Sequence, residues 1–343
     1  MKILKQSVGI DVAKNDFKVC LAQLDEQLNV AFRFQKAYDN NPRGVALFLK
    51  EVRRLFTEDV TVQFVVEASG VYHELLAHKI YQHGYNVSII LPTKSKAFFK
   101  SINQRVKTDK VDARLLSQLG VERQLDKWVP PDPVYAQMRS LTRERESLLK
   151  EKTIVANKIH AQQAAFQVAK STLRRSKQRL KLLQKQILNI DSELRSLIES
   201  SEKLSSRVHE ITKVKGLSML TVATVIAETN GFSIIRNQKQ LVGYVGLDVV
   251  INQSGQKLSK GRLSKKGNGH IRRALYMPAL SSSRSNELMK IIYQQLNQRQ
   301  AAKKQGVMVV AKKLLLTIYA LWKNNTEYDP QKNIESRLVL STV

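Results

Sequence analysis

Short apolar runs separated by polar residues dominate the first third of the chain. Such runs occupy residues 7–12, 16–22 and 29–33, and their length and spacing predict three successive strands in a meander. Another apolar run at residues 61–66 ends at an acid, Glu67, and an Ala-Ser-Gly break follows it at once. The pattern predicts an N-terminal domain of the α/β class that is built on a β-sheet.

Helical periodicity replaces the strand pattern after the Val-Pro-Pro-Asp-Pro stretch at residues 129–133, and no further proline occurs until Pro278. Apolar residues at alternating spacings of three and four predict a heptad-patterned helix over residues 180–197, and a weaker register predicts another over residues 138–166. Joined near residues 170–175, the two helices suggest an antiparallel hairpin or an oligomerising coiled coil. Ordinary packing of two helices within one subunit is the alternative.

The pattern changes again from about residue 206. Residues 211–217 and 221–228 predict two helices joined by a turn at Gly216. In a helix-hairpin-helix, such a turn places backbone N–H groups and a helix N-terminus against a phosphate, so the pattern favours contact with a DNA backbone. Any tight helical hairpin could use a glycine at the same place.

Charge is distributed unevenly along the 343 residues, a length that allows two or three domains at about 100–200 residues each. The net charge is +28, and a balance this basic favours polyanionic partners. Residues 1–130 hold 20 Lys and Arg against 14 Asp and Glu, a net +6, which leaves +22 for the remaining 213 residues. The first part therefore resembles the core of an enzyme, and the rest resembles a nucleic-acid-binding region.

Two basic segments stand out in the second part. Seven Lys and Arg and no acid occur between residues 257 and 273, among glycines that let backbone approach a ligand closely. With the turn glycine, the candidate nucleic-acid contacts are Lys257, Lys260, Arg262, Lys265, Lys266, Arg272, Arg273 and Gly216. The second segment is the charge run at residues 174–181, for which a solvated helix face and a phosphate-backbone contact both remain open.

Cysteine usage and hydropathy limit the remaining classes. The single cysteine, Cys20, lies in an apolar strand, which excludes an internal disulfide and a cysteine-based zinc site. No signal peptide and no uninterrupted apolar span of about 18 residues occurs, so we expect a cytoplasmic protein without a membrane partner.

Four acidic residues are placed so that their carboxylates could converge: Asp11, Glu67, Asp109 and Asp112. Two come from predicted strands, and the other two, three residues apart, would share one face of a helix. Each has an ordinary explanation as well, in a turn, at a solvated strand end or at a helix cap. Four carboxylates would suffice to hold two Mg²⁺ ions, which activate an attacking oxygen and stabilise a leaving one.

Ser254 lies just before the basic segment at residues 257–273. Ser254 precedes Gly255, and in that position a serine is most often a turn residue. Nearby cations would also stabilise a serine alkoxide and the charge that develops on phosphate, so Ser254 could instead attack a phosphodiester.

Five stretches of the sequence together resemble the insertion sequence 110 (IS110) family of transposases, which are bridge-RNA-guided serine recombinases related to the pilin-gene invertases. These stretches are residues 9–14, 67–72, 107–114, 254–255 and 264–276. The resemblance covers nearly the whole chain in the right order. It implies a RuvC-like (ribonuclease-H-like) α/β catalytic domain at residues 1–133, a helical coiled-coil region at 134–205, and a mostly α-helical C-terminal transposase domain with a helix-hairpin-helix at 206–343.

The same resemblance implies a division of catalytic roles. Asp11, Glu67, Asp109 and Asp112 take the place of an Asp-Glu-Asp-Asp quartet that binds Mg²⁺, and Ser254 takes the place of the nucleophile that links covalently to DNA. A structured noncoding RNA, the guide or bridge RNA, would select target and donor DNA by base pairing. A composite site shared between subunits implies at least a dimer, and a tetramer when two duplexes are brought together in synapsis.

Three other functions remain open. A metal-dependent Holliday-junction or other structure-specific nuclease would need the quartet and water but neither the serine nor the long helical region. A sugar kinase of the actin-like fold would share the first strands, yet no second phosphate loop is recognisable and the +28 charge is unusual for it. A noncatalytic nucleic-acid-binding protein would tolerate changes of all four acids.

Overall fold

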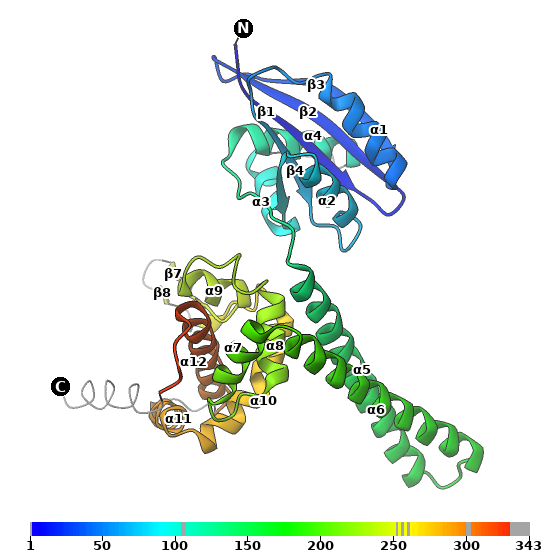
Figure 1. The fold of residues 1–343 in the computed structure, drawn as a ribbon, viewed down its shortest axis with the longest axis vertical. Coiled ribbons are helices and arrows are strands. Elements are labelled where there is room, and N and C mark those ends of the chain that lie inside the picture. The colour runs from blue at the N-terminus through cyan, green and yellow to red at the C-terminus, as the bar shows by residue number, and fades with distance from the viewer. Residues whose placement is uncertain are drawn as a thin grey trace, which may run out of the picture. The chain divides into compact units, whose positions relative to one another are not determined.

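The computed structural model describes residues 2–103, 108–251, 253–254, 257–258, 261–299 and 303–329. The chain forms two compact units, Met1–Pro130 and Pro131–Val343. Each unit has its own arrangement of helices and strands (Figure 1).

In its described residues, the first unit contains a five-stranded mixed sheet with strand order β3-β2-β1-β4-β5. The strands are β1 (Ile3–Val12), β2 (Asp16–Asp25), β3 (Val30–Asp39), β4 (Val62–Glu67) and β5 (Asn86–Ile90). The first three pair antiparallel as a meander, whereas β4 pairs parallel with both β1 and β5. The predicted meander and the strand that ends at Glu67 are confirmed, and β5 is a strand that the sequence pattern did not identify.

Helices cover both faces of this sheet: α1 (Pro42–Arg53), α2 (Glu74–Gln82), α3 (Pro92–Ser101) and α4 (Asp109–Glu122). Alternate residues of β1 point to opposite faces. Val8, Ile10 and Val12 join the hydrophobic core that α1 and α2 cover. Gly9 lies against α4, and Asp11 shares that face because it is two residues further along the strand. The period of two therefore places Asp11 on the α4 face of the sheet.

The second unit is predominantly helical in its described residues. Its helices are α5 (Pro133–Ala164), α6 (Lys170–Glu199), α7 (Glu202–Thr212), α8 (Met219–Glu228), α9 (Gln238–Val245), α10 (Gly269–Ser285), α11 (Glu287–Arg299) and α12 (Lys303–Asn324). Two short antiparallel pairs accompany them: β6 (Val249–Val250) with β9 (Arg262–Leu263), and β7 (Gln253–Ser254) with β8 (Lys257–Leu258). One large hydrophobic core joins α7 to α12 with the near ends of α5 and α6.

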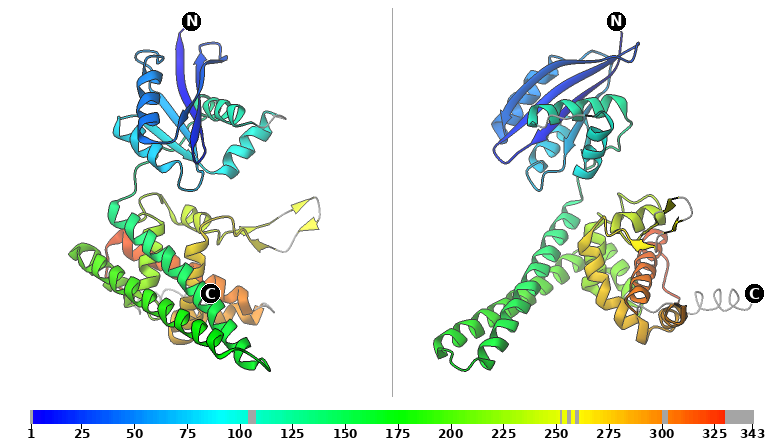
Figure 2. Two further views of the ribbon diagram at one scale, coloured as in Figure 1. Left: turned by 90° about the vertical axis from the view of Figure 1, so that its right-hand side faces the viewer. Right: turned by 180° about the vertical axis from the view of Figure 1, so that it is seen from behind.

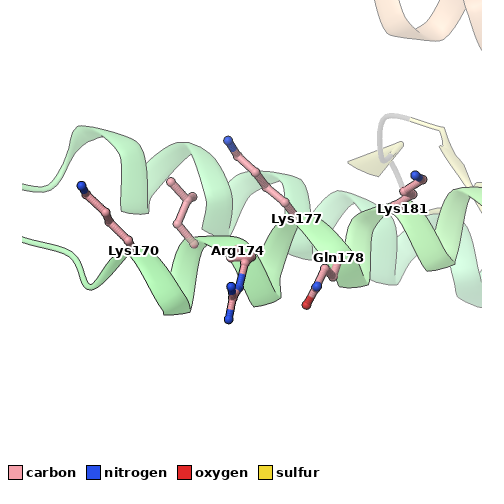
Figure 3. Close-up of a pocket in the computed structure, with 6 residues that line it drawn as sticks. Lys170, Arg174, Lys177, Gln178 and Lys181 are labelled. Atoms are coloured by element: carbon pink, nitrogen blue, oxygen red, sulfur yellow. The ribbon is translucent and has the colours of Figure 1, made fainter.

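The two long helices α5 and α6 pack along each other, and their far ends share a small apolar cluster around Val155, Ile159 and Leu183. Their connection lies at residues 165–169, earlier than the predicted 170–175. The heptad register had included Phe166 in the first helix, but its side chain is 99% exposed and belongs to the connection. We call this pair of helices the hairpin. Its far end projects away from the other helices of the unit (Figure 2). Near that end, basic residues of α6 line an open groove (Figure 3).

Among the described residues, one segment, Lys304–Asn324 in α12, is long and apolar enough to cross a membrane. Half of its apolar stretch is buried inside the unit, where α12 supplies Leu314, Leu315 and Ile318 to the core. Burial within a core accounts for the apolar character of this helix.

Candidate active site

The four predicted acids come from three elements of the first unit. Asp11 is the penultimate residue of β1, and Glu67 is the last residue of the neighbouring parallel strand β4. Asp109 and Asp112 lie in the first turn of α4, whose N-cap Thr108 accepts a hydrogen bond from the N–H of Val111 through its side chain. Both strands therefore present an acid at the same edge of the sheet, near the helix end that carries the other two.

Electrostatics shows that these carboxylates lie near one another. Burial, together with the negative charges of Asp109, Asp112 and Glu67, raises the pKa of Asp11 from an ordinary value of 3.8 to about 6. The positive charge of Lys18 lowers the pKa of Asp11. Because three other carboxylates raise the pKa of Asp11, a cation bound beside it would be stabilised by their negative charge.

Two further side chains belong to this cluster. Lys18 lies directly opposite Asp11 in the pairing of β1 with β2, and its Nζ donates a 2.6 Å hydrogen bond to Oδ2 of Asp109. Ser95, in α3, donates its hydroxyl to Oε2 of Glu67 at 2.6 Å. Sequence reasoning missed both residues. The tight β1–β2 hairpin could have placed Lys18 opposite Asp11, but nothing local to the sequence connects Ser95 with Glu67.

Two glycines allow α4 to lie directly on the sheet. A Cβ at Gly9 would meet backbone atoms of α4 at 2.1 Å from Ser117 N and 2.2 Å from Ala113 O. A Cβ at Gly120 would lie 2.0 Å from the hydroxyl oxygen of Ser7. Strand β1 and helix α4 thus approach each other so closely that neither position has room for a side chain. This contact fixes the helix that carries Asp109 and Asp112 beside the strand that carries Asp11.

The chemistry of these donors suits a hard divalent cation. Carboxylate oxygens are the ligands that Mg²⁺ prefers, and their mutual repulsion at Asp11 would be relieved by a bound cation. Within the described ranges, no three His, Cys, Asp or Glu side chains form a ready-made metal-binding group. The four carboxylates would therefore have to draw closer together to share an ion.

The predicted serine lies in the second unit. The backbone of Ser254 belongs to β7 and is paired with Lys257 of β8. Side chains of residues 252–260, including those of Ser254 and Lys257, lie outside what the structure describes, and Lys260 lies outside the described residues altogether. Arg262, at the start of β9, is exposed.

The other predicted basic contacts divide into two kinds. Lys265 and Lys266 are exposed, and Lys265 has a positive φ of 52°. Arg272 donates through Nη1 to the carbonyl oxygen of Val245 at 2.5 Å, and Arg273 forms an ion pair with Glu146. These two arginines therefore have partners within the unit, one in α9 and one in α5.

Gly216 lies between α7 and α8, as the pattern predicted, with a φ of +100° that favours glycine. Its turn packs against α10, where the hydroxyl of Ser282 donates to the carbonyl oxygen of Lys215 at 3.0 Å and lies 2.0 Å from where a Cβ of Gly216 would be. Packing within the unit is therefore enough to explain a glycine at this position. A phosphate contact of the same turn stays a prediction.

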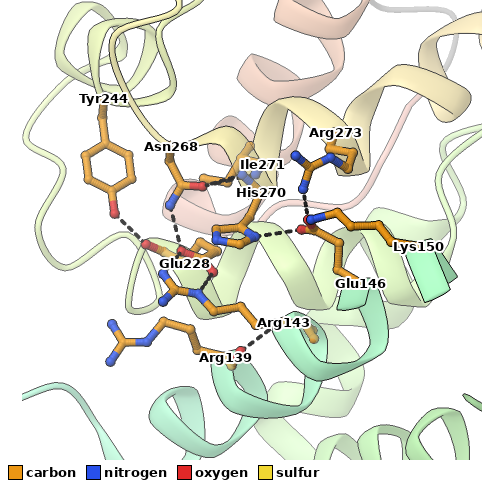
Figure 4. Close-up of polar contacts among 11 residues, drawn as sticks. Arg139, Arg143, Glu146, Lys150, Glu228, Tyr244, Asn268, His270, Ile271 and Arg273 are labelled. Atoms are coloured by element: carbon orange, nitrogen blue, oxygen red, sulfur yellow. Dashed lines mark hydrogen bonds and ion pairs between the residues drawn. The ribbon is translucent and has the colours of Figure 1, made fainter. Parts of the chain in front are cut away.

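A buried polar network around Glu228 joins α5, α8 and the start of α10 (Figure 4). The carboxylate of Glu228 accepts hydrogen bonds from Arg143 at 2.7 and 2.9 Å and from Asn268 at 2.6 Å. Burial by itself would raise the pKa of Glu228, but the hydrogen bonds from Arg143 and Asn268 outweigh it and hold this pKa below its ordinary value. Nearby, a nitrogen of His270 contacts Glu146 at 2.6 Å. Sequence reasoning missed this network because its members are far apart along the chain.

Comparison with known proteins gives matches over both units. Residues 8–166 match a family model described as a transposase, of the DEDD type of IS110, and residues 208–294 match the model of the transposase IS116/IS110/IS902 family. The pilin gene-inverting proteins of Moraxella bovis and Moraxella lacunata are each 28% identical over 332 residues, covering 95% of this chain and 98% of theirs. The solved structure of RuvC from Thermus thermophilus is 11% identical, covers 36% of this chain and 99% of its own, and has a TM-score of 0.30.

Proposed function

Because this chain belongs to the IS110 family of transposases, we propose that it is the recombinase of an insertion sequence, which cuts and rejoins DNA under the guidance of an RNA. One observation carries the catalytic part of this proposal. Asp11, Glu67, Asp109 and Asp112 lie near enough on one side of a sheet for three of them to raise the pKa of the fourth. Such a cluster has the donor chemistry for holding divalent cations at a DNA phosphate.

The acidic cluster would hold Mg²⁺, with two ions per site in the family to which the sequence is similar. When bound, Mg²⁺ neutralises charge on a scissile phosphate and lowers the barrier to its substitution. The protein's own residues define the place. Ser95 orients Glu67 by a hydrogen bond, and Lys18 supplies positive charge beside Asp109. The close contact at Gly9 keeps α4 in position.

Ser254 would serve as the nucleophile that joins the protein to DNA. Its Oγ would form an ester bond to phosphorus as the bond from phosphorus to the deoxyribose oxygen breaks. The proton that the serine loses is balanced by the proton that the leaving oxygen gains. A covalent link conserves the energy of the broken phosphodiester for rejoining, whereas hydrolysis would release it. This assignment depends on the family resemblance around residues 254–255.

The partners follow from the same proposal. Target and donor DNA would be selected by base pairing with a structured noncoding RNA, and the net charge of +28 supports binding of such polyanions. The serine of one subunit could meet the acids of another, so a dimer, and a tetramer in synapsis, form part of the proposal. The names of the Moraxella relatives, which refer to inversion of a pilin gene, support a DNA rearrangement in place of simple cleavage. The reaction would take place on DNA in the cytoplasm.

Four single substitutions test the acidic cluster. Asp11→Asn, Glu67→Gln, Asp109→Asn and Asp112→Asn should each abolish recombination between donor and target plasmids and leave nucleic-acid binding within a few-fold of the wild type. Glu26→Gln is the matched control, because Glu26 is an exposed acid of the same unit. Recombination retained in any two of the four variants would remove the metal-site assignment.

A second experiment separates recombinase from nuclease. RNA that co-purifies with the protein is recovered, and recombination is assayed with and without it for the wild type and Ser254→Ala. A guided serine recombinase requires the RNA and forms a protein–DNA adduct, visible on a denaturing gel, that Ser254→Ala loses. Cleavage that needs neither the RNA nor the serine would identify a plain metal-dependent nuclease.

A further inference from the structure

The far part of the hairpin carries positive charge only. Residues 152–190, which we call the basic arm, contain nine Lys and Arg and no Asp or Glu. The basic residues are Lys152, Lys158, Lys170, Arg174, Arg175, Lys177, Arg179, Lys181 and Lys185. All of them are exposed except Lys152, which is half-buried. The arm therefore presents a strongly cationic surface at the end of the hairpin that projects from the unit (Figures 1 and 2).

The near part of the hairpin is different in kind. It mixes both signs, and some of its cations pair with acids, as Arg145 does with Asp191 at 2.5 Å and Lys150 with Glu146 at 2.7 Å. In the basic arm, all of whose residues the structure describes, no such ion pair is found. Arg175 of the arm donates a hydrogen bond to the hydroxyl of Thr172 at 3.3 Å. Its positive charges are thus uncompensated within the described structure.

Four of these cations form a row on α6. Lys170, Arg174, Lys177 and Lys181 are spaced by four, three and four residues, so they lie on one face of the helix. With Leu173 and Gln178 they line the open groove of Figure 3. At a rise of about 1.5 Å per residue, the row spans about 16 Å along a straight helix. A linear array of this length can contact several successive phosphates of one nucleic-acid strand.

Such a row of like charges does not stabilise the folded protein. Like charges three or four residues apart destabilise a helix by about 0.2–0.5 kcal/mol per pair, and Lys170 with Arg174 and Lys177 with Lys181 are such pairs. A second copy of the same arm would be repelled as well. A polyanion compensates this repulsion on binding.

The residue types in the arm indicate which polyanion. Proteins hold single strands by stacking bases on several aromatic side chains. The basic arm contains one aromatic residue, Phe166, at its tip. Long Lys and Arg side chains on a rigid helix suit the phosphate backbone of a duplex, because phosphate contacts need charge and do not need access to base edges.

We propose that the basic arm binds the phosphate backbone of duplex DNA without reading its sequence. This proposal rests on the proposed function for one choice, that the duplex is DNA and not RNA. The contact of the hairpin with DNA would be separate from any contact of residues 257–273 or of the acidic cluster.

The test compares two variants of the full chain that each lose four positive charges. The arm variant carries Lys170→Gln, Arg174→Gln, Lys177→Gln and Lys181→Gln. The control carries Arg43→Gln, Lys50→Gln, Arg53→Gln and Arg54→Gln, all at exposed positions on or just after α1. Binding to a labelled DNA duplex of mixed sequence is measured by fluorescence anisotropy over a series of salt concentrations in chelator. Circular dichroism confirms that both variants are folded.

The arm variant should bind duplex DNA at least tenfold more weakly than the wild type, and the slope of log affinity against log salt should fall in magnitude by about 3 to 4, close to 0.9 per lost contact. The control should keep the wild-type slope. An unchanged slope in the arm variant, an equal loss in the control, or a loss confined to an RNA duplex or to single strands would overturn the proposal.

A proximity probe gives an independent measurement. Cys20 is buried, with 1% exposure, so a cysteine introduced by Gln178→Cys can be labelled selectively with an iron chelate that cleaves nearby DNA. Ser147→Cys, at an exposed position on the near part of the hairpin, is the control. Cleavage of a bound duplex from residue 178 in excess over residue 147 is expected, and equal or absent cleavage from residue 178 would contradict the proposal.

Both measurements are independent of catalysis. The anisotropy is recorded in chelator, and the cleavage probe is used in an Asp11→Asn background. Loss of recombination in the acidic-cluster variants would thus leave the result on the arm unchanged. Failure of the arm to bind DNA would likewise leave the metal-site assignment unaffected.

Discussion

At the scale of single residues, the acidic cluster and the Glu228 network treat buried carboxylates in opposite ways. Burial and, after it, the charges of three nearby acids raise the pKa of Asp11 to about 6. Glu228 receives two hydrogen bonds from Arg143 and one from Asn268, and its pKa lies below the ordinary value. Asp11 therefore lowers the stability of the folded protein at neutral pH, whereas Glu228 contributes to it.

The first prediction concerns Asp11→Asn. A folded-state pKa of about 6, above the ordinary 3.8, means that the contribution of Asp11 to stability is complete below about pH 4 and is lost as the pH rises through 6. In chelator near pH 8, the neutral amide should raise the free energy of unfolding by about 1–3 kcal/mol, at 1.36 kcal/mol per unit of pKa. Near pH 4 the variant and the wild type should be almost equal.

Urea denaturation at the two pH values measures this difference, with Glu26→Gln as the control for loss of an exposed charge. A stabilisation of equal size at both pH values would show that the neighbouring carboxylates do not cause it.

The second prediction concerns Glu228→Gln. The substitution leaves Arg143 without its charged partner in a site where the side chain of Glu228 is 1% exposed. A fully buried pair costs about 3–5 kcal/mol to break, and the half-exposed arginine reduces the expected loss to about 2 kcal/mol. Because the folded-state pKa is depressed, the difference from the wild type should shrink as the pH falls below the ordinary value of 4.5.

Thermal unfolding at neutral and acidic pH measures this loss, and Glu199→Gln, an exposed acid at the end of α6, is its control. A loss independent of pH would indicate that shape, and not charge, determines the contribution of Glu228.

At the scale of elements, the contact between β1 and α4 determines how the acidic cluster is assembled. Strand periodicity places Asp11 on the α4 face, and helix periodicity places Asp109 and Asp112 together in one turn. Neither pattern states how far apart strand and helix lie. Gly9 and Gly120 set that distance, because a Cβ at either position would collide with the partner element.

The third prediction is that Gly9→Ala destabilises the first unit by about 3 kcal/mol, at the upper end of the range for overpacked cores. The new methyl group would meet backbone atoms, which cannot rotate away as a side chain can. As α4 shifts, Asp109 and Asp112 move from Asp11, so the pKa of Asp11, followed by NMR titration, should fall toward its ordinary value.

Gly243→Ala is the matched control. Nothing lies within 4 Å of a Cβ at Gly243 in α9, and alanine is favoured over glycine in a helix by about 0.5–1 kcal/mol. It should leave the second unit equally or more stable. A Gly9→Ala protein as stable as the wild type would mean that α4 can move outward without cost.

At the scale of the whole molecule, the two units divide core and charge between them. Each has its own large hydrophobic core in the described residues, the first between the sheet and α1 and α2, the second among α7 to α12. Residues 1–130 hold the four acids, while +22 of the net +28 charge belongs to the rest of the chain. The division fits a catalytic unit joined to a unit that holds nucleic acid.

The fourth prediction is that residues 1–130 fold when produced alone and unfold in one cooperative transition. Mg²⁺ should raise the unfolding midpoint of this fragment in a concentration-dependent way, since a ligand that binds only the folded state stabilises it. Differential scanning calorimetry measures the shift. The same fragment with Glu67→Gln should lose most of it, and a shift that persists in this variant would place the ion elsewhere.

Local pattern by itself determined much of this protein. The short apolar runs at residues 7–12 and 16–22 determined the first strands, and the spacing of apolar residues determined the helix over residues 180–197 of α6. The conformational freedom of glycine marked the turn at Gly216. The four acids could be selected because strand ends and helix starts are local features. Nine basic residues and no acid in residues 152–190 likewise determine the charge of the hairpin without any knowledge of the fold.

Only the tertiary structure decided which distant groups meet. It placed Lys18 beside Asp109 and Ser95 beside Glu67, and it gave Arg272 and Arg273 partners inside the second unit. It also moved Phe166 from a predicted helix into an exposed connection. Propensity and periodicity act over a few residues, whereas these contacts join residues 27 to 127 positions apart, and the packing that brings them together depends on the whole unit.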